Sequence, residues 1–322
     1  MMTGKELVTR AVLFQGPERI PQELPEPWGS DFTWVGTSPE PGWTPKVEGE
    51  DEWGCVWRKP PSGKTMGQVV VHPLSDYAML DAFRFPDYKN PARYAGAVEK
   101  IAGNTEKKFV MASVPLSLIH RLEYLRGHAE GWTDPYTHPE QLGRLLDKMA
   151  DIAIDAVRHF ARAGADGIMS WDDWGLQDRP MMSPEMFREH FKPRYARVYG
   201  EAKKLGMLTF LHSCGHVADL LDHFIEADLQ VIQMDQQENM GIDNLARRFA
   251  GRICFWCPVD IQQTMNFGSL DDVRVYARKL VESFGRYNGG FIAKWYPDPE
   301  SAGHSPERVQ AMCEAFVKYG KR

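Results

Sequence analysis

Short apolar segments of strand length alternate with segments of helical period from about residue 109 to the end of the chain. The apolar segments span residues 109–115, 167–171, 207–211, 229–234, 253–256 and 290–293. Between the first two, Leu142, Leu145 and Met149 recur at the spacing of one helix face. Similar apolar faces follow at residues 217–225, 273–284 and 309–316. Repeated strand–helix alternation predicts a parallel sheet with right-handed crossover connections.

Two helix starts can be recognised in the sequence, and the number of strands favours a closed barrel. A Thr-His-Pro-Glu segment beginning at Thr137 is a predicted capping box, and Ser183 precedes a second helix that starts with proline. One or two further strands are expected around residues 68–72 and 79–83. No glycine-rich dinucleotide loop follows any strand, so the pattern favours an α/β fold of the (β/α)₈ TIM-barrel type over an open doubly wound sheet.

The segment from about residue 21 to residue 73 differs in composition from the rest of the chain. It is rich in proline and glycine and contains Trp28, Trp34, Trp43, Trp53 and Trp57. This composition predicts an irregular layer, whose aromatic surface either lines a pocket or packs over a core. We expect a single barrel domain over residues 1–322, with an N-terminal arm and cap at 1–75 and the barrel at 76–322.

Composition and charge narrow the possible classes of function. The 322-residue chain has 43% hydrophobic and 25% charged residues, as expected for a globular protein with a substantial core. Its net charge of −6, without a basic face, argues against nucleic-acid binding, and no apolar run is long enough to span a membrane. The N-terminal residues lack a secretory segment, so we expect a cytoplasmic protein whose five cysteines are thiols.

A metal-site prediction rests on the apolar segment at 207–211, which leads into His-Ser-Cys-Gly. His212 and Cys214 are two positions apart, and such residues project from the same face of an extended strand. Imidazole and thiolate are ligands that zinc prefers, and the chemistry of a barrel lies at the carboxyl ends of its strands. We predict a zinc site at His212 and Cys214, completed by Cys257 at another strand end or by a nearby carboxylate.

Other polar residues are expected at the same end of the barrel. Asp172 and Asp173 follow the 167–171 segment and are candidate catalytic residues, although either could instead be a ligand or a helix cap. Neighbouring residues of a strand face opposite ways, so only one of the two can enter the mouth. Lys294 either binds an anionic substrate or is an exposed surface lysine. The other predicted substrate contacts at strand ends are Trp174, Asp235, Gln237 and Trp295.

Sequence motifs occur along most of the chain. They are GADGI at 164–168, DDWG at 172–175, SPEMF at 183–187, FLHSCG at 210–215, FW at 255–256 with VD at 259–260, and GGFIA at 289–293 with SPE at 305–307. Together these motifs resemble the uroporphyrinogen decarboxylase superfamily, and more specifically its branch of cobalamin-dependent methyltransferases. The resemblance implies a barrel with a zinc-binding His-x-Cys pair at His212 and Cys214. In that branch a third cysteine follows the last strand, where this chain has Lys294, Trp295 and Tyr296 instead.

The resemblance also implies candidate substrate contacts. The active-site tyrosine of the true decarboxylases would fall near His120 or Arg121 of this chain, and their N-terminal arginine motif is not recognisable here. A porphyrinogen substrate is therefore the less favoured implication.

The leading hypothesis is a zinc-dependent methyltransferase that acts between a corrinoid and either a small methoxy or methylamine-type donor or a thiol acceptor. No histidine of this chain has aspartate two positions before it, so the corrinoid (cobalamin) is expected on a partner protein. A second hypothesis is a decarboxylase-like lyase that needs no metal, with Asp172 or Asp173 as the acid and Arg121 or Arg126 binding substrate carboxylates. A third is a binding protein that kept the barrel and lost the chemistry.

Overall fold

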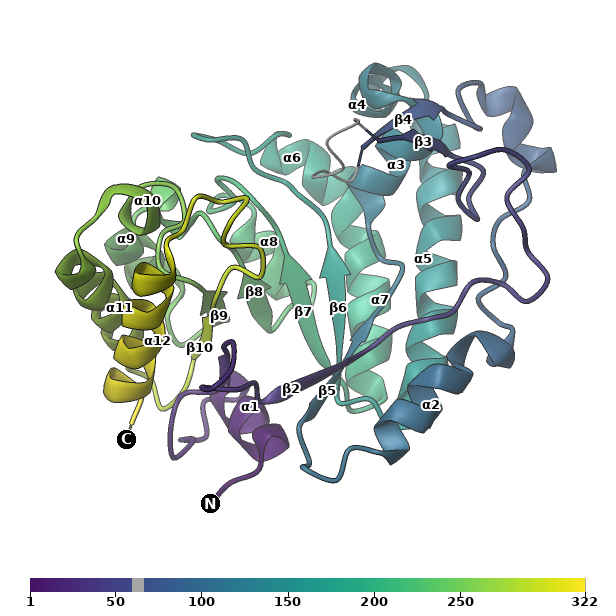
Figure 1. Cartoon of the computed structure of the whole chain (residues 1–322). Coiled ribbons are helices and arrows are strands. Elements are labelled where there is room, and N and C mark those ends of the chain that lie inside the picture. Colours follow the sequence, from purple (N-terminus) through teal and green to yellow (C-terminus); the bar gives the residue numbers. More distant parts are fainter. Residues whose placement is uncertain (60–66, 322) are drawn as a thin grey trace.

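The computed structural model describes residues 1–59 and 67–321, and a barrel of eight parallel strands is its central feature (Figure 1). The strands pair in the order β1 (Gln22–Glu23), β10 (Phe291–Lys294), β9 (Cys254–Cys257), β8 (Val231–Gln233), β7 (Leu208–His212), β6 (Gly167–Trp171), β5 (Phe109–Ser113) and β2 (Phe32–Val35). The N–H of Asp31, the residue before β2, donates to the carbonyl of Gln22 in β1 at 2.9 Å, so the two end strands lie close together and the barrel is nearly closed. The predicted (β/α)₈ barrel is confirmed.

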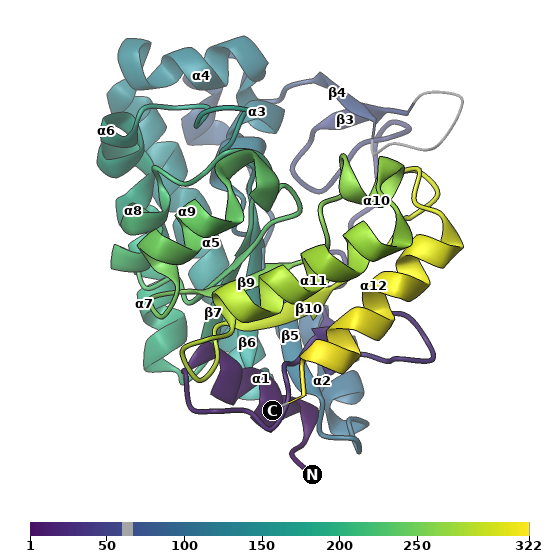
Figure 2. The ribbon, with the colours of Figure 1, turned by 90° about the vertical axis from the view of Figure 1, so that its left-hand side faces the viewer.

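Helices surround the barrel and cover the outer face of its strands (Figures 1 and 2). In chain order they are α1 (Gly4–Val12), α2 (Ala95–Ala102), α3 (Leu118–Arg126), α4 (His128–Thr137), α5 (Pro139–Ala163), α6 (Pro184–Met186), α7 (Lys192–Lys204), α8 (Leu221–Glu226), α9 (Ile242–Phe249), α10 (Thr264–Phe267), α11 (Leu270–Phe284) and α12 (Pro306–Tyr319). Short 3-10 helices lie at Tyr77–Ala82, Pro91–Tyr94 and Gln237–Met240, and a π-helical turn at Phe187–Phe191 joins α6 to α7. None of the described helices is long and apolar enough to cross a membrane.

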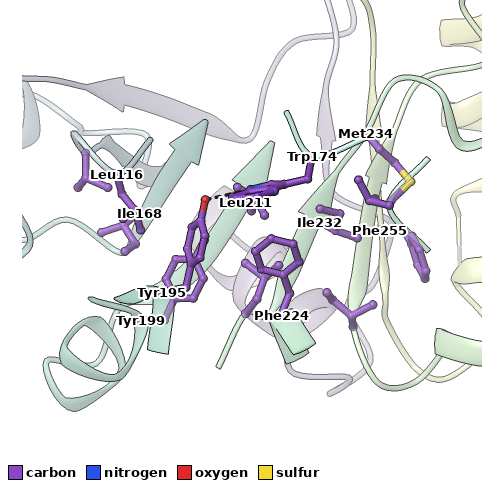
Figure 3. Packing of buried hydrophobic residues seen from close by; sticks show 14 of the residues in the cluster. Leu116, Ile168, Trp174, Tyr195, Tyr199, Leu211, Phe224, Ile232, Met234 and Phe255 are labelled. Carbon is purple, nitrogen blue, oxygen red and sulfur yellow. Dashed lines mark hydrogen bonds between the residues drawn. The ribbon is translucent and has the colours of Figure 1, made fainter. Parts of the chain in front are cut away.

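Apolar side chains form two layers, one inside the barrel and one between the strands and the helices. The alternation of β9 shows the division, because Cys254 and Trp256 belong to the inner layer while Phe255 and Cys257 belong to the outer one. Helix α1 closes the end of the barrel where both chain termini lie, and its Val8 completes the inner layer there. Figure 3 shows part of the outer layer. The polar site can therefore lie only at the opposite end, above the inner layer.

The two strands that complete the barrel come from the tryptophan-rich N-terminal segment. The prediction that residues 68–72 and 79–83 form barrel strands is wrong. β4 (Gln68–Val71) pairs antiparallel with β3 (Val56–Arg58) in a separate hairpin, and the 79–83 segment lies largely in a 3-10 helix. Residues 1–75, expected as an arm and cap, contribute β1 and β2 to the barrel sheet. β1 and β2 are too short to show a hydrophobic period, so the sequence pattern does not reveal them.

Two helix starts test the capping predictions. The Ser183 hydroxyl accepts a hydrogen bond from the Met186 N–H at 3.3 Å and begins α6 as predicted. The capping box at Thr137 is wrong, since the N-cap of α5 is His138 and its side chain makes no cap hydrogen bond. Thr137 is the last residue of the preceding helix α4, so it does not begin α5.

Candidate metal centre

Three potential metal ligands meet at the carboxyl ends of β6 and β7. Nε2 of His212 lies 3.4 Å from Sγ of Cys214 and 3.5 Å from Oδ1 of Asp173. One ligand atom from each of the three residues fits within a mutual distance of 4.8 Å. The structure therefore brings together the predicted His-x-Cys pair and a carboxylate from the neighbouring strand.

Backbone packing holds Asp173 against Cys214. The parallel register pairs Trp171 with His212, which places the residues that follow the two strands side by side. The loop after β6 and the loop after β7 then contact each other at Gly175 and Gly215. The approach is so close that a Cβ on Gly215 would lie 2.1 Å from the carbonyl oxygen of Gly175. Oδ1 of Asp173 accepts the Cys214 N–H at 2.7 Å. The carboxylate is thus positioned by the same contacts that hold the two loops together.

The distances and donor types fit zinc. Zn–N and Zn–S bonds of about 2.1 and 2.3 Å at a tetrahedral angle place the two donor atoms about 3.5 Å apart. The measured separations of Nε2 from Sγ and from Oδ1 agree with that value. A nitrogen, a sulfur and an oxygen donor form a mixed set that suits borderline-soft zinc, and three protein ligands leave a fourth position for a reactant.

A chain of hydrogen bonds orients the His212 ring. Nε2 of Gln233 donates to Oδ1 of Asp235 at 2.8 Å, so the amide oxygen of Gln233 faces Nδ1 of His212, with which it makes a hydrogen bond. Nδ1 is the N–H donor in that hydrogen bond, and Nε2 faces Cys214 and Asp173. Lys294 completes the chain, with Nζ 2.8 Å from Oδ1 of Asp235.

The surroundings of the site raise the pKa of Cys214 and lower the pKa of Asp235. Burial raises the pKa of the Cys214 thiol, and the neighbouring Asp173 and Asp235 carboxylates raise it further. Burial also acts to raise the pKa of Asp235, but the nearby Lys294 and His212 outweigh it and hold that pKa below its usual value. A metal cation at the three ligands would favour the Cys214 thiolate, because a coordinated thiol loses its proton.

Two cavities meet at the three ligands. His212 lines a cavity of about 400 Å³ whose walls include Trp34, Trp171, Trp256 and Tyr296. Asp173 and Cys214 line a second cavity of about 330 Å³ with polar walls. The candidate metal centre thus separates an aromatic cavity from a polar one, so two reactants could approach it from different sides.

Asp172, predicted as a catalytic candidate, is fully buried behind β6 and lines neither cavity. Its carboxylate accepts the backbone N–H groups of Ile119 and His120, each at 3.0 Å, and the hydroxyl of Tyr195. It binds the N-terminus of α3, a helix that precedes it in the chain, whereas the alternative considered from the sequence was a cap of the segment that follows it. Burial raises its pKa, although His120 and the hydrogen-bond donors act to lower it.

Three other predicted site residues are packing residues in the structure. Trp174 is fully buried, packs against Phe187 and Phe191, and donates from Nε1 to the Tyr195 hydroxyl at 3.1 Å (Figure 3). Cys257 lies in the outer layer because β9 alternates, and it is not among the three clustered ligands. The Gln237 side chain is buried and donates to the Pro258 carbonyl at 2.8 Å.

The remaining predicted contacts divide between the two cavities and the surrounding structure. Asp235 and Lys294 line the aromatic cavity, and His120 lines the polar one with Nε2 3.6 Å from Oδ2 of Asp173. Arg121 pairs with Asp51 at 3.3 Å and lines neither cavity. Trp295 packs against the outer core rather than facing the aromatic cavity.

Several cavity residues were not predicted as site residues. They are Glu23, Trp34, Trp171, Gln233, Trp256 and Tyr296. One signal was available for Gln233, a polar residue inside the apolar segment 229–234, at the position that parallel pairing places beside His212. Trp34 gave only the compositional signal of the tryptophan-rich segment and Glu23 gave none, because their strands could not be recognised.

The chain belongs to the uroporphyrinogen decarboxylase (URO-D) family, which it matches over residues 63–319. Curated relatives are similar at low identity. One is a uroporphyrinogen decarboxylase from Xanthomonas euvesicatoria, 26% identical over 281 residues that cover 80% of this chain and 74% of the relative. Another, from Thioalkalivibrio sulfidiphilus, is 23% identical over 272 residues, with 80% and 73% covered.

Among solved structures, the fold is similar to that of a methyltransferase from Methanosarcina mazei. The superposition has a TM-score of 0.70 and covers 99% of both chains at 16% sequence identity. At that identity the likeness shows a shared barrel and nothing about the reaction.

Proposed function

We propose that this protein is a zinc-dependent methyltransferase that moves a methyl group between a small methylated compound or a thiol and a corrinoid on a partner protein. The observation that carries the proposal is the convergence of His212, Cys214 and Asp173 at the barrel mouth. Family membership and the barrel fold shared with a methyltransferase are compatible with it. The absence of an Asp-x-His segment from the sequence is the reason to place the corrinoid on a partner.

Each side chain has a role that follows from its position. Zinc held by the three ligands would act as a Lewis acid toward a heteroatom of the methyl donor or toward a thiol acceptor. Gln233 orients His212 so that Nε2 faces the other two ligands, and Asp235 with Lys294 orients Gln233. The aromatic walls give the His212 side of the centre a largely apolar lining. The polar cavity leaves the other side accessible.

The decarboxylase-like alternative has support from the names of the curated relatives. A lyase acting on a carboxylated substrate needs cationic groups free to bind it. Arg121 instead pairs with Asp51 and lies over the Trp53 ring, and Arg126 is buried against Asp134 at 2.8 Å. Both arginines therefore stabilise the protein's own structure, which favours the methyltransferase.

Metal analysis provides the first test. Wild-type protein purified without chelators should hold about one equivalent of zinc. Cys214→Ala should lose most of it, whereas Cys313→Ala, which removes a buried thiol from α12, should keep it. If wild type and both variants bind equally little zinc, the metal centre is ruled out.

A transfer assay provides the second test. Wild-type protein is mixed with a reduced corrinoid protein and candidate methoxy, methylamine or thiol compounds, and the cobalt absorption spectrum is followed. We expect a spectral change with at least one compound, and none with Cys214→Ala. No change with any compound, together with release of carbon dioxide from a carboxylated substrate, would establish the lyase instead.

A further inference from the structure

Three indole rings form a continuous wall in the cavity beside His212. The Trp34 ring lies 6.0 Å from the Trp171 ring and 6.1 Å from the Trp256 ring, measured between centroids. Trp171 is 40% exposed and its ring lies 5.4 Å from the His212 imidazole. The wall therefore begins next to the candidate metal centre and continues down into the barrel.

A carboxylate outside any described ion pair lies in this wall. Glu23, Asp235 and Lys294 all line the cavity. Lys294 is paired with Asp235, so the charges of these two residues balance each other. A zinc ion held by one thiolate, one carboxylate and a neutral imidazole would add no net charge. Glu23 thus supplies a carboxylate in addition to the Lys294–Asp235 pair.

Glu23 is fixed against the aromatic wall. Its Oε1 accepts a hydrogen bond from Nε1 of Trp34 at 2.6 Å. Burial raises its pKa, while that hydrogen bond and the Lys294 charge act to lower it. A cation placed against Trp34 would favour the ionised carboxylate, because an opposite charge in a buried site offsets the cost of desolvation.

We propose that this aromatic cavity binds the methylated ammonium group of a small organic cation, with the N-methyl groups against Trp171 and Trp34 and with Glu23 as the counter-charge. The inference rests on the proposed function and specifies the class of its methyl donor. Indole faces attract quaternary ammonium groups through the ring quadrupole, and a nearby carboxylate adds to that attraction. A neutral methoxy compound would gain nothing from Glu23, and an anionic one would be repelled.

The test compares two ligands of the same shape and different charge. Isothermal titration calorimetry measures binding of choline and of 3,3-dimethylbutan-1-ol, in which carbon replaces the charged nitrogen. We expect saturable choline binding that is about tenfold tighter than that of the neutral alcohol. Equal affinities, or binding of the alcohol alone, would overturn the inference, because the cavity would then recognise shape without charge.

Variants identify the cavity as the binding site. Trp171→Leu and Glu23→Gln should each weaken choline binding about tenfold. Trp43→Leu is the matched control, since Trp43 lines a separate groove of the N-terminal layer, and it should bind choline as wild type does. Thermal unfolding followed by circular dichroism checks that each variant is folded. Unchanged choline affinity in folded Trp171→Leu and Glu23→Gln would place the cation elsewhere and overturn the inference.

The result can be separated from the test of the proposed function. Cys214→Ala should keep its choline affinity, because Cys214 does not line the aromatic cavity. Choline binding without any methyl transfer would contradict the proposed reaction and leave the cation site standing. Methyl transfer from a neutral methoxy donor, with no preference for choline over the alcohol, would contradict the cation site alone.

Discussion

His212 depends on a neighbour that has no metal chemistry of its own. Gln233 reaches Nδ1 of His212 from the next strand and is itself oriented by Asp235. This arrangement sets the tautomer of the imidazole and the direction of its free nitrogen. At the residue scale, the ligand set therefore extends beyond the three atoms that would touch a metal.

Replacing Gln233 tests that dependence. We expect Gln233→Leu to lower zinc affinity by about 10- to 100-fold, because His212 loses the acceptor that fixes its ring. Competition with a chromophoric chelator measures the affinity. Gln310→Leu is the control, since Gln310 lies on α12 and bonds only to Glu314 at 2.8 Å. Zinc affinity unchanged in Gln233→Leu would remove Gln233 from the site.

The Lys294–Asp235 pair tests the charge balance inside the barrel. Both side chains are almost fully buried. Lys294→Met leaves the Asp235 carboxylate without its cation and should lower the free energy of unfolding by about 3–5 kcal/mol near neutral pH. Lys279→Met breaks an exposed pair with Asp243 and should cost about 0–1 kcal/mol. Urea denaturation measures both values.

The effect of Lys294→Met should depend on pH. In wild type the lowered pKa of Asp235 gives stability above its unfolded pKa of about 3.9, which is lost as pH falls through the folded pKa. In the variant, burial acts without the lysine and raises the folded pKa, so protonation of Asp235 relieves the cost. The difference in unfolding free energy should therefore shrink as pH falls from about 8 toward the unfolded pKa of about 3.9. A difference that is constant over this range would contradict the explanation.

At the scale of elements, the adjacent residues Asp172 and Asp173 at the carboxyl end of β6 have different roles. Asp173 turns toward the cavities, while Asp172 turns toward α3 and accepts its first backbone N–H groups. Opposite orientation of neighbouring strand residues makes both roles possible. The strand end thus joins the candidate site to the helix layer.

Asp172→Ala should separate the two roles. Loss of the carboxylate leaves buried N–H groups of α3 without acceptors and should lower the free energy of unfolding by about 2–4 kcal/mol. Asp172→Asn keeps one acceptor oxygen and should lose less. Zinc content at saturation should stay near wild type in whichever variant remains folded. Full stability of Asp172→Ala would contradict the capping role.

At the scale of the whole molecule, the N-terminal segment is part of the barrel. β2 pairs with β5 and β1 pairs with β10, so these two strands fill the space between the first and last strands of the repeating pattern. They also bring Glu23 and Trp34 into the aromatic cavity. The tryptophan-rich layer therefore has both of the roles that its composition suggested, because it packs over a core and also lines a pocket.

A chain of residues 76–322 should not fold on its own. It lacks β1, β2 and α1, so the inner faces of Phe109 and Ile292 would be exposed to water. We expect no cooperative thermal transition by circular dichroism and strong binding of a hydrophobic dye, whereas the full chain should melt cooperatively. A cooperative transition with native near-ultraviolet dichroism would show that the barrel can form from six strands.

The sequence by itself determined the features that depend on local periodicity. Six strands, the long helices between them and the shared face of His212 and Cys214 all follow from the spacing of residues within one element. The barrel class followed from the alternation of those elements. Candidate ligands at the mouth could be read from residue types at strand ends, because parallel strands bring those ends together.

Only the tertiary structure decided the rest. The third candidate ligand is Asp173 rather than Cys257, because register between β6 and β7 and the contact at Gly175 place it there. β1 and β2 are stabilised by pairing with strands far along the chain rather than by any period of their own. Register and closure of a barrel depend on contacts between distant residues, and a single sequence carries no local signal for such contacts.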